Sequence, residues 1–339
     1  MRSNILFICP SPTDATSWYR GYGPFGELRK KLPDISLITG VEKFTWAIFQ
    51  MTDITFMQRP YSKNHLTIAE MSKDSKNLLW VDFDDDLFSV PQDNPTYDIY
   101  SKDDTQRNIA TIIAMADVVT VSTLFLKRRL EKLNKNIHVI NNAFNDYLFN
   151  FFEPKPFSDR PKFFNWRGSK THHRDILVNS MAILNMANKS LVKNWKWHWI
   201  GYNPWYVNER FKDGQVIISE GVDVMEYHKF IAKLQPTCQI VPLADSKFNR
   251  SKSNIAWIEA TYSGAVTIAP LWEEWNHQGV FNYECDIEKS FQNRLEEVME
   301  TSDSLLQDHL DASRELIMEN YLLSKINKQR VEIIEGMRL

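Results

Sequence analysis

The sequence predicts an α/β protein of two domains, each built around a doubly wound parallel sheet. Short apolar segments alternate with helical segments through the first half of the chain, the alternation stops at 151–161, and it then restarts. Alternation of this kind is typical of parallel strands covered by helices on both faces. A length of 339 residues is long for one core and suits two domains.

The first domain is expected at 1–150. Its opening segment NILFIC (4–9) is a continuous apolar run bounded by prolines, as expected for a strand that is buried on both faces. Segment 23–32 follows with helical periodicity and a proline near its start. The same pattern predicts further strands at 35–40, 53–60, 77–84, 117–123 and 137–144, and helices at 105–116 and 124–134.

A linker and a second domain follow. FFEPKPFSDRP (151–161) has three prolines and no periodicity, which is typical of a connection between domains. The second domain is expected at 162–304, with strands at 162–168, 195–202, 215–221, 238–243 and 265–270. Residues 305–339 have a helical pattern throughout, and we expect these helices to cross back onto the first domain.

Composition excludes some classes of function. A formal net charge of -3 disfavours a purely electrostatic nucleic-acid binder, although it allows an enzyme with a local basic groove. The basic run KRRLEKLNK (127–135) has helical spacing and is compatible with a solvated helix face or with such a groove. The widely spaced Cys9, Cys238 and Cys285 match no metal-binding pattern and indicate a reducing compartment. No segment approaches the ~20 apolar residues of a membrane span, so we expect a cytoplasmic protein without stable membrane insertion.

Two sheets in tandem place the carboxyl ends of their strands on either side of a cleft, where ligands of open α/β sheets bind. Neither domain carries the glycine motif of dinucleotide-binding proteins or the P-loop. The most informative segment is NRSKSNIAWIEATYSGAVTIAP (249–270), which places polar and basic residues directly before a helix. Arg250 and Lys252 suit a diphosphate, and Ser253 or Asn254 suits the helix N-cap. Glu259 then lies on the helix, where it is either a ligand for ribose hydroxyls or a solvent-facing acid.

This segment resembles the nucleotide-sugar-binding segment of GT-B glycosyltransferases, particularly glycosyltransferase family 4 and its bacterial and phage-encoded relatives. Many members have two glutamates separated by seven residues, and the second holds the nucleotide ribose. Glu259 matches the second glutamate, whereas Ser251 stands at the position of the first. The resemblance implies a GT-B fold with two Rossmann-like domains, a nucleotide-sugar co-substrate, no required divalent metal, and retention of anomeric configuration.

A second segment agrees with this resemblance. NWRGSKTHHRDI (165–176) is similar to the strand–loop–helix segment that opens the donor domain of the same enzymes. By resemblance, Arg167, Ser169 and Lys170 would face the donor phosphates; the alternative is a loop with scattered surface charges. Tyr202, at the end of a predicted strand, is expected near the nucleotide base. His172 and His173 are placed to reach the cleft, although one of two adjacent histidines is usually solvated.

The first domain carries two further candidate segments. WVDFDDDLF (80–88) resembles an acidic string in some bacterial and phage members, and it places Asp84, Asp85 and Asp86 after an apolar strand. Acids this close repel, so some should have raised pKa values. They are candidates for acceptor binding or for removal of the acceptor proton. Metal binding and an ordinary acidic strand end are the alternatives.

The loop after the first strand is the second candidate. The family often has a Tyr-Arg pair before its first helix, and this chain has WYRG at that place. The resulting prediction is a stacking and hydrogen-bonding surface for the acceptor, formed by Trp18, Tyr19, Arg20 and Gly21. The alternative is a hydrophobic plug with a surface arginine.

Together these segments predict a glycosyltransferase whose second domain binds the donor. The residues expected to stabilise the departing diphosphate are Arg167, Lys170, Arg250 and Lys252. A soluble polymer is the expected acceptor, and a hydroxymethylated base in phage-type DNA is the leading candidate, contacted by 127–135 and 18–22. The alternatives are a surface polysaccharide or glycan as acceptor, a non-catalytic nucleotide-sugar-binding module, or an epimerase of the same fold. The oligomeric state is left open.

Overall fold

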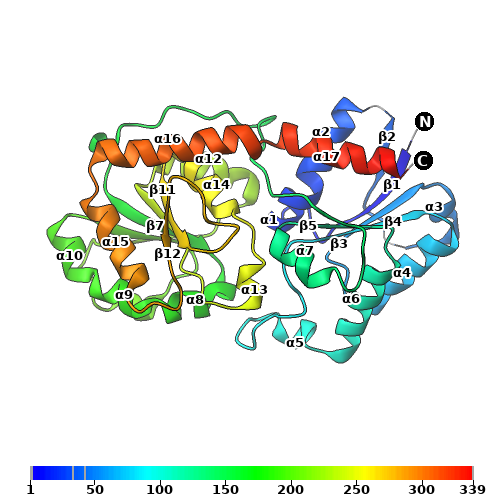
Figure 1. Cartoon of the computed structure of the whole chain (residues 1–339), viewed down its shortest axis with the longest axis horizontal. Coiled ribbons are helices and arrows are strands. Elements are labelled where there is room, and N and C mark those ends of the chain that lie inside the picture. The colour runs from blue at the N-terminus through cyan, green and yellow to red at the C-terminus, as the bar shows by residue number, and fades with distance from the viewer. Residues whose placement is uncertain (1–2, 33, 42, 338–339) are drawn as a thin grey trace.

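The computed structural model describes residues 3–32, 34–41 and 43–337 and has two α/β lobes (Figure 1). The first lobe contains a six-stranded sheet in the order β2-β1-β3-β4-β5-β6. Every neighbouring pair is parallel. Its strands are β1 Ser3–Ile8, β2 Ile35–Ile38, β3 Ile54–Gln58, β4 Leu78–Phe83, β5 Val118–Val121 and β6 Ile137–Val139.

The second lobe contains another six-stranded sheet in the order β12-β11-β10-β7-β8-β9. It is also parallel throughout. Its strands are β7 Phe163–Gly168, β8 Lys196–Gly201, β9 Val216–Ser219, β10 Cys238–Ile240, β11 Val266–Pro270 and β12 Val280–Tyr283. The two sheets confirm the predicted fold class. The last strand, β12, is a finding that the sequence pattern did not predict, because its burial alternates between buried and half-buried in only four residues.

Helices cover both faces of the first sheet. They are α1 Ala15–Ser17, a π-helical turn at Trp18–Tyr22, α2 Gly23–Lys31, α3 Trp46–Gln50, α4 Lys63–Asp74, α5 Tyr97–Tyr100, α6 Asp103–Met115 and α7 Leu124–Leu130. In α6, Ile109, Ile112 and Ile113 recur at helical spacing and are fully buried against the sheet. The Ser62 side chain accepts from the amide of His65 and so fixes the start of α4.

The second sheet is covered in the same way. Its helices are η2 Phe157–Asp159, η3 Lys170–His172, α8 His173–Val178, α9 Ser180–Asn185, α10 Ala187–Val192, α11 Trp205–Asn208, α12 Val224–Leu234, α13 Lys247–Arg250, α14 Ile255–Tyr262, α15 Ser290–Glu300 and α16 Asp303–Asn320. The core between helices and sheet is aromatic, and Trp197 and Trp199 stack there with exposures of 0% and 1%.

The chain then crosses back to the first lobe. Helix α16 packs on the second lobe, where the indole of Trp257 in α14 donates to Ser313. Helix α17 (Leu323–Gly336) lies over the first lobe instead (Figure 1). There the amide of Asn327 donates to the carbonyl of Pro24 at the start of α2. The return of the C-terminal helix to the first domain is therefore confirmed.

Each sheet has one point at which the strand order reverses, because later strands are added on the opposite side of the first strand. In the first sheet this switch point lies between β1 and β3, and in the second between β7 and β10. Ligands of open α/β sheets bind outside the carboxyl ends of the strands at such points. The loops after these four strands are therefore where the fold places a site.

Candidate functional site

Two cavities lie at the carboxyl ends of the strands, and both include residues of the two lobes. The donor-side cavity, of about 630 Å³, is lined by residues 13–15 of the first lobe and by Arg167–Lys170, Ile200–Tyr202, Gly221–Val224, Tyr227 and Glu259 of the second. The cleft cavity, of about 200 Å³, lies between the lobes and includes Arg59, Asp84, Asp85, His172 and Lys252. Ala15 and Arg167 line both cavities, so the two adjoin at these residues.

Glu259 is the central acid of the donor-side cavity. It projects from α14 and is 4% exposed. Arg167, the second-to-last residue of β7, forms an ion pair with the Oε2 atom of Glu259. The hydroxyl of Tyr19, from the first lobe, donates to its Oε1 atom at 2.5 Å. A buried carboxylate of this kind needs such partners, and it suits the hydroxyls of a sugar equally well.

The other predicted donor residues are divided between the two cavities. Ser169 and Lys170 line the donor-side cavity at the carboxyl end of β7, and Tyr202 lines it after β8. Ser169 supplies the cap of this turn, because its hydroxyl accepts from the Thr171 amide. Lys252 and Ser253 line the cleft cavity instead.

Two predicted donor residues lie outside both cavities. The guanidinium of Arg250 forms a two-point ion pair with Asp245 and stacks over the ring of Trp272. The amide of Asn254, fully buried, lies 3.0 Å from the ring of His277, and its side chain makes no capping hydrogen bond to α14. The structure therefore gives both residues a supporting role in the fold.

In the cleft cavity, acids of the first lobe meet cations of both lobes. Both carboxylate oxygens of Asp84 accept from Arg59. Asp85 accepts from Arg59 at 2.6 Å and lies 3.4 Å from the ammonium of Lys252 across the cleft. Lys252 thus joins the donor lobe to the acidic segment after β4.

The two acids differ in their pKa values. Burial raises the pKa of Asp84 to about 6, against the opposing effect of Arg59. Burial acts to raise the pKa of Asp85 as well, but Lys252 and Arg59 together outweigh burial and hold the pKa of that carboxyl below its ordinary range. Neighbouring acids with divergent pKa values can divide acid–base work, one exchanging a proton and the other remaining charged.

Asp86, the third predicted acid, lies outside the cavity. Its side chain is fully buried, and it accepts from Arg129 and from the backbone amide of Phe88. Its own amide donates to the hydroxyl of Ser251 in the second lobe. Asp86 therefore holds the acidic loop and ties it to the other domain.

Three of the predicted acceptor residues are also used within the fold. Arg20 is 1% exposed and makes a two-point ion pair with Asp82 at the end of β4. A Cβ on Gly21 would lie 2.6 Å from the sulfur of Cys9, so this glycine allows close packing on β1. Trp18 is half-buried outside both cavities. Of this segment, only Tyr19 lines the cleft cavity.

Arg59 is a site residue that the sequence analysis missed. It follows β3 with φ 48°, a left-handed conformation that costs of order 1–3 kcal/mol for a residue other than glycine. Its backbone amide donates to the carbonyl of Asp82, and this contact helps to hold the unusual conformation. The available signal was a basic residue at the carboxyl end of a predicted strand, directly before a proline.

His172 and Asp175 form a second pair that sequence reasoning did not assign. The Nδ1 atom of His172 lies 2.7 Å from the carboxylate of Asp175, and both residues line the cleft cavity. His173, its neighbour, turns the other way and lies 2.8 Å from the hydroxyl of Tyr202. The two histidines thus occupy different environments one residue apart.

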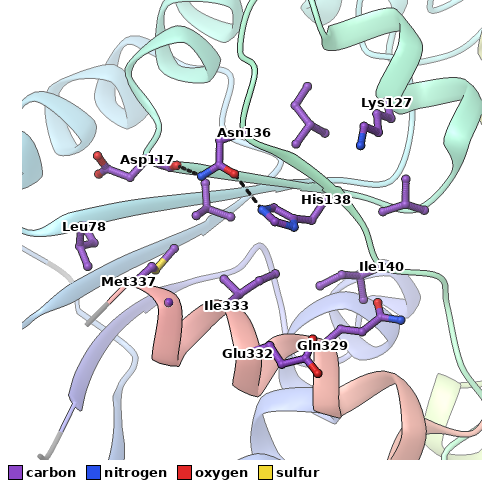
Figure 2. Close-up of a pocket in the computed structure, with 14 residues that line it drawn as sticks. Leu78, Asp117, Lys127, Asn136, His138, Ile140, Gln329, Glu332, Ile333 and Met337 are labelled. Carbon is purple, nitrogen blue, oxygen red and sulfur yellow. Dashed lines mark hydrogen bonds between the residues drawn. The ribbon is translucent and has the colours of Figure 1, made fainter. Parts of the chain in front are cut away.

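A larger cavity of about 760 Å³ lies elsewhere, beside β6 and helix α17 (Figure 2). Asn136 there donates to the carbonyl of Asp117 and lies 2.8 Å from the ring of His138. Leu78, Asp117 and Asn136 mark the amino ends of β4, β5 and β6, so this hollow faces away from the two switch points. Its position argues against a role in the chemistry of the cleft.

Two arginines of the basic run 127–135 are engaged in ion pairs. Arg129 binds Asp86, and Arg128 binds Glu273 of the second lobe through both of its terminal nitrogens. Within the described residues, no group of three or more histidines, cysteines and acids is arranged to hold a metal ion. Over the same residues, the helices are too short or too polar to cross a membrane.

Solved structures identify the fold. HepE of Anabaena, solved with UDP and glucose, has a TM-score of 0.67 at 12% identity, and the match covers 99% of this chain and 100% of HepE. The trehalose-phosphate synthase of Burkholderia vietnamiensis gives 0.66 at 9% identity, covering 98% and 96% of the two chains. TarM gives 0.58 at 13% identity; the match covers 82% of this chain and only 54% of TarM.

A fourth neighbour has a different activity in its name. A protein from Listeria monocytogenes named as a UDP-N-acetylglucosamine 2-epimerase matches with a TM-score of 0.58 at 13% identity, covering 99% and 96% of the two chains. No protein-family model and no curated protein sequence matches the chain. The structural matches show that this chain has the GT-B fold, as the resemblance of its motifs implied.

Proposed function

We propose that this GT-B protein is a glycosyltransferase that moves a sugar from a nucleotide-sugar donor to a hydroxyl acceptor. One observation carries the proposal. A cavity in the second lobe, walled by Glu259, Arg167 and Lys170, adjoins at Arg167 a smaller cavity between the lobes that contains Asp84, Asp85 and Lys252. This order of groups matches the order of a nucleotide sugar, from nucleoside through diphosphate to sugar.

In this proposal the donor-side cavity holds the nucleoside. Tyr202 and residues 221–224 also line this cavity and would contact the base. Glu259 would accept from the ribose hydroxyls in place of its present partners. Arg167 and Lys252 would stabilise the negative charge on the diphosphate as it leaves. In this proposal the two cations take that role without a divalent metal ion.

The acidic pair would act on the acceptor. The acceptor oxygen bonds to the anomeric carbon, the bond from that carbon to the β-phosphate oxygen breaks, and its electron pair leaves with the nucleoside diphosphate. Asp84, with a pKa of about 6, is suited to take the acceptor proton at neutral pH. Asp85 stays ionised beside Lys252 and suits a role in holding hydroxyls.

The acceptor is proposed to be a saccharide hydroxyl. Asp84 and Asp85 line the cleft cavity together with Trp166 and Trp275, and the indole nitrogen of Trp275 is buried without a hydrogen-bond partner. Carboxylates and aromatic faces together suit a sugar ring. The expected contacts to DNA carry less weight, since Arg128 and Arg129 are engaged by acids and Arg20 is buried. A hydroxymethylated DNA base is therefore the second acceptor to test.

Two further points follow from the neighbours' names. HepE was solved with UDP-glucose, and a neighbouring trehalose-6-phosphate synthase is described as transferring with retention. Accordingly, UDP-sugars are the first donors to test. Retention is the proposed outcome, and it requires the acceptor oxygen to attack the anomeric carbon on the face from which the phosphate departs. The epimerase neighbour makes conversion of the nucleotide sugar itself the alternative activity.

The test is incubation of the full-length protein with UDP-glucose and UDP-N-acetylglucosamine, separately with saccharide acceptors and with hydroxymethylated duplex DNA. A glycosylated saccharide with equimolar UDP is the expected result. A changed nucleotide sugar without acceptor would establish the epimerase instead. UDP binding without turnover would establish a binding module, and salt-sensitive transfer to DNA would establish the DNA acceptor.

A further inference from the structure

The His172–Asp175 pair lies in the cleft cavity without a role in the reaction as described so far. We infer that His172, held by Asp175, is the cationic donor to the β-phosphate oxygen that leaves with the nucleoside diphosphate. This inference rests on the proposed function, because it needs a nucleotide sugar in the adjoining cavities.

Asp175 is held in place by hydrogen bonds to three groups. This carboxylate is 5% exposed, and its Oδ1 atom accepts from the amide of Ala244 at 3.0 Å and from the side chain of Asn249 at 2.6 Å. Its Oδ2 atom is then directed to the Nδ1 atom of His172 at 2.7 Å. Three contacts fix the acid, so Asp175 is a positioning residue that sets the orientation of the imidazole.

Gly168 leaves space for the imidazole ring of His172. A Cβ on Gly168 would lie 2.7 Å from the ring of Trp166 and 3.2 Å from Cδ2 of His172. Only a glycine leaves room for both rings at this last residue of β7. With Nδ1 engaged by Asp175, the Nε2–H of the imidazolium is the donor left for a ligand in the cavity.

His172 belongs to the second lobe and follows Arg167 by five residues in the loop after β7 at the switch point. The acids proposed to act on the acceptor, Asp84 and Asp85, come from the opposite lobe. His172 therefore stands with the groups proposed for the diphosphate, whereas the acceptor acids face it across the cavity.

The bond between the anomeric carbon and the β-phosphate oxygen breaks, and its electron pair stays on that oxygen. The imidazolium Nε2–H donates to this oxygen and stabilises the new charge, or transfers its proton to it, while the acceptor proton passes to the carboxylate of Asp84. Release of the nucleoside diphosphate and exchange with water restore both groups.

The test uses UDP bound to the full-length protein, followed by phosphorus NMR between about pH 5 and pH 9. In the wild type, the imidazolium should lower the pH at which the β-phosphate of bound UDP loses its proton. His172→Gln should raise that midpoint by about one unit and weaken UDP binding about tenfold. Asp175→Asn should also raise the midpoint of the β-phosphate titration. The groups that face His172 are Asp175 on α8, Arg167 on β7, Lys252 before α14, and Asp84 and Asp85 after β4.

His173→Gln is the matched control, because this neighbour points to Tyr202 and should leave the β-phosphate midpoint unchanged. Thermal unfolding checks that each variant is folded. Equal midpoints in wild type and His172→Gln, with UDP bound to both, would overturn the inference and leave the proposed function standing. Failure of the wild type to bind UDP or any other nucleoside diphosphate would overturn the proposed function and the inference with it.

Discussion

The hydroxyl of Tyr19 in the first lobe donates a hydrogen bond at 2.5 Å to the carboxylate of Glu259 in the second lobe, 240 residues away in the chain. Tyr19 is 8% exposed and Glu259 is 4% exposed, so water cannot readily replace either partner. In the proposed donor complex, ribose hydroxyls compete with Tyr19 for the same carboxylate. Donor binding and contact between the lobes are therefore linked through one acid.

Tyr19→Phe should destabilise the nucleotide-free protein and tighten nucleotide binding. Loss of the hydroxyl leaves a buried carboxylate oxygen without its donor, at a cost of about 1–3 kcal/mol. A ribose hydroxyl restores that hydrogen bond, so UDP should bind about tenfold more tightly. Calorimetry and thermal unfolding check both effects, with Tyr22→Phe in the same π-helical turn as the control. Weaker UDP binding by Tyr19→Phe would contradict the competition.

Asp84 and Asp86 should respond differently to the same substitution. Asp84→Asn is expected to lower kcat about 100-fold, because it removes the proposed proton acceptor. Asp86→Asn should instead lower the Tm, since its one remaining oxygen can accept from only one of the two donors, Arg129 and the amide of Phe88, and its NH2 group then lies against the other. Steady-state kinetics and thermal unfolding separate the two effects. Equal losses of kcat in both variants would argue against the assignment of Asp84.

The pH dependence of transfer gives an independent check on Asp84. A proton acceptor must be ionised to work, and burial raises the pKa of this carboxyl to about 6. Activity should therefore be low below pH 6 and rise as the pH increases through that value. The residual activity of Asp84→Asn should lack this rise. If the activity of Asp84→Asn still rose with pH at the same midpoint, the ionisation would belong to another group.

Arg167 and Arg250 test where the diphosphate lies. Both were expected at the donor from the sequence, but Arg167 lines both cavities, whereas Arg250 is engaged by Asp245 outside them. Arg167→Ala should weaken UDP binding at least tenfold, and Arg250→Ala by less than about threefold. Calorimetric titration with UDP measures both affinities. The reverse order would move the diphosphate toward α13.

Gly264 and Gly26 should respond oppositely to alanine. Gly264 has φ +83°, and a Cβ there would lie 2.6 Å from Pro154 in the linker. Gly264→Ala should therefore cost more than about 2 kcal/mol of the free energy of unfolding. Gly26 lies in α2 with no atom within 4 Å of its ideal Cβ, so Gly26→Ala should add up to about 1 kcal/mol. Denaturant unfolding measures both changes.

Local patterns were enough to predict the fold and part of the site. The alternation of apolar and helical segments indicated both sheets, because parallel strands buried on two faces are continuous apolar runs. The segments around Arg167 and Glu259 carry their signal in consecutive residues, so the sequence brought these two into one proposed site. The structure then joins them by an ion pair.

Long-range pairing was beyond local patterns. Arg20 had the appearance of a cleft residue, and only the structure shows that Asp82, 62 positions away, holds it in the interior. Arg59 acquires its importance from a left-handed backbone and from two acids that follow the next strand, β4. The contact between Tyr19 and Glu259 depends on how the two domains meet. No period or motif in the sequence encodes that relation.

The most direct measurement is the affinity for UDP of the wild type and of Glu259→Ala, by isothermal titration calorimetry. Glu297→Gln, an exposed acid on α15, is the control. The proposed function predicts that UDP binds the wild type and the control alike, and that Glu259→Ala weakens binding at least tenfold, since the ribose loses its carboxylate. Equal affinity in all three proteins, or no binding by the wild type, would contradict the assignment of the donor site.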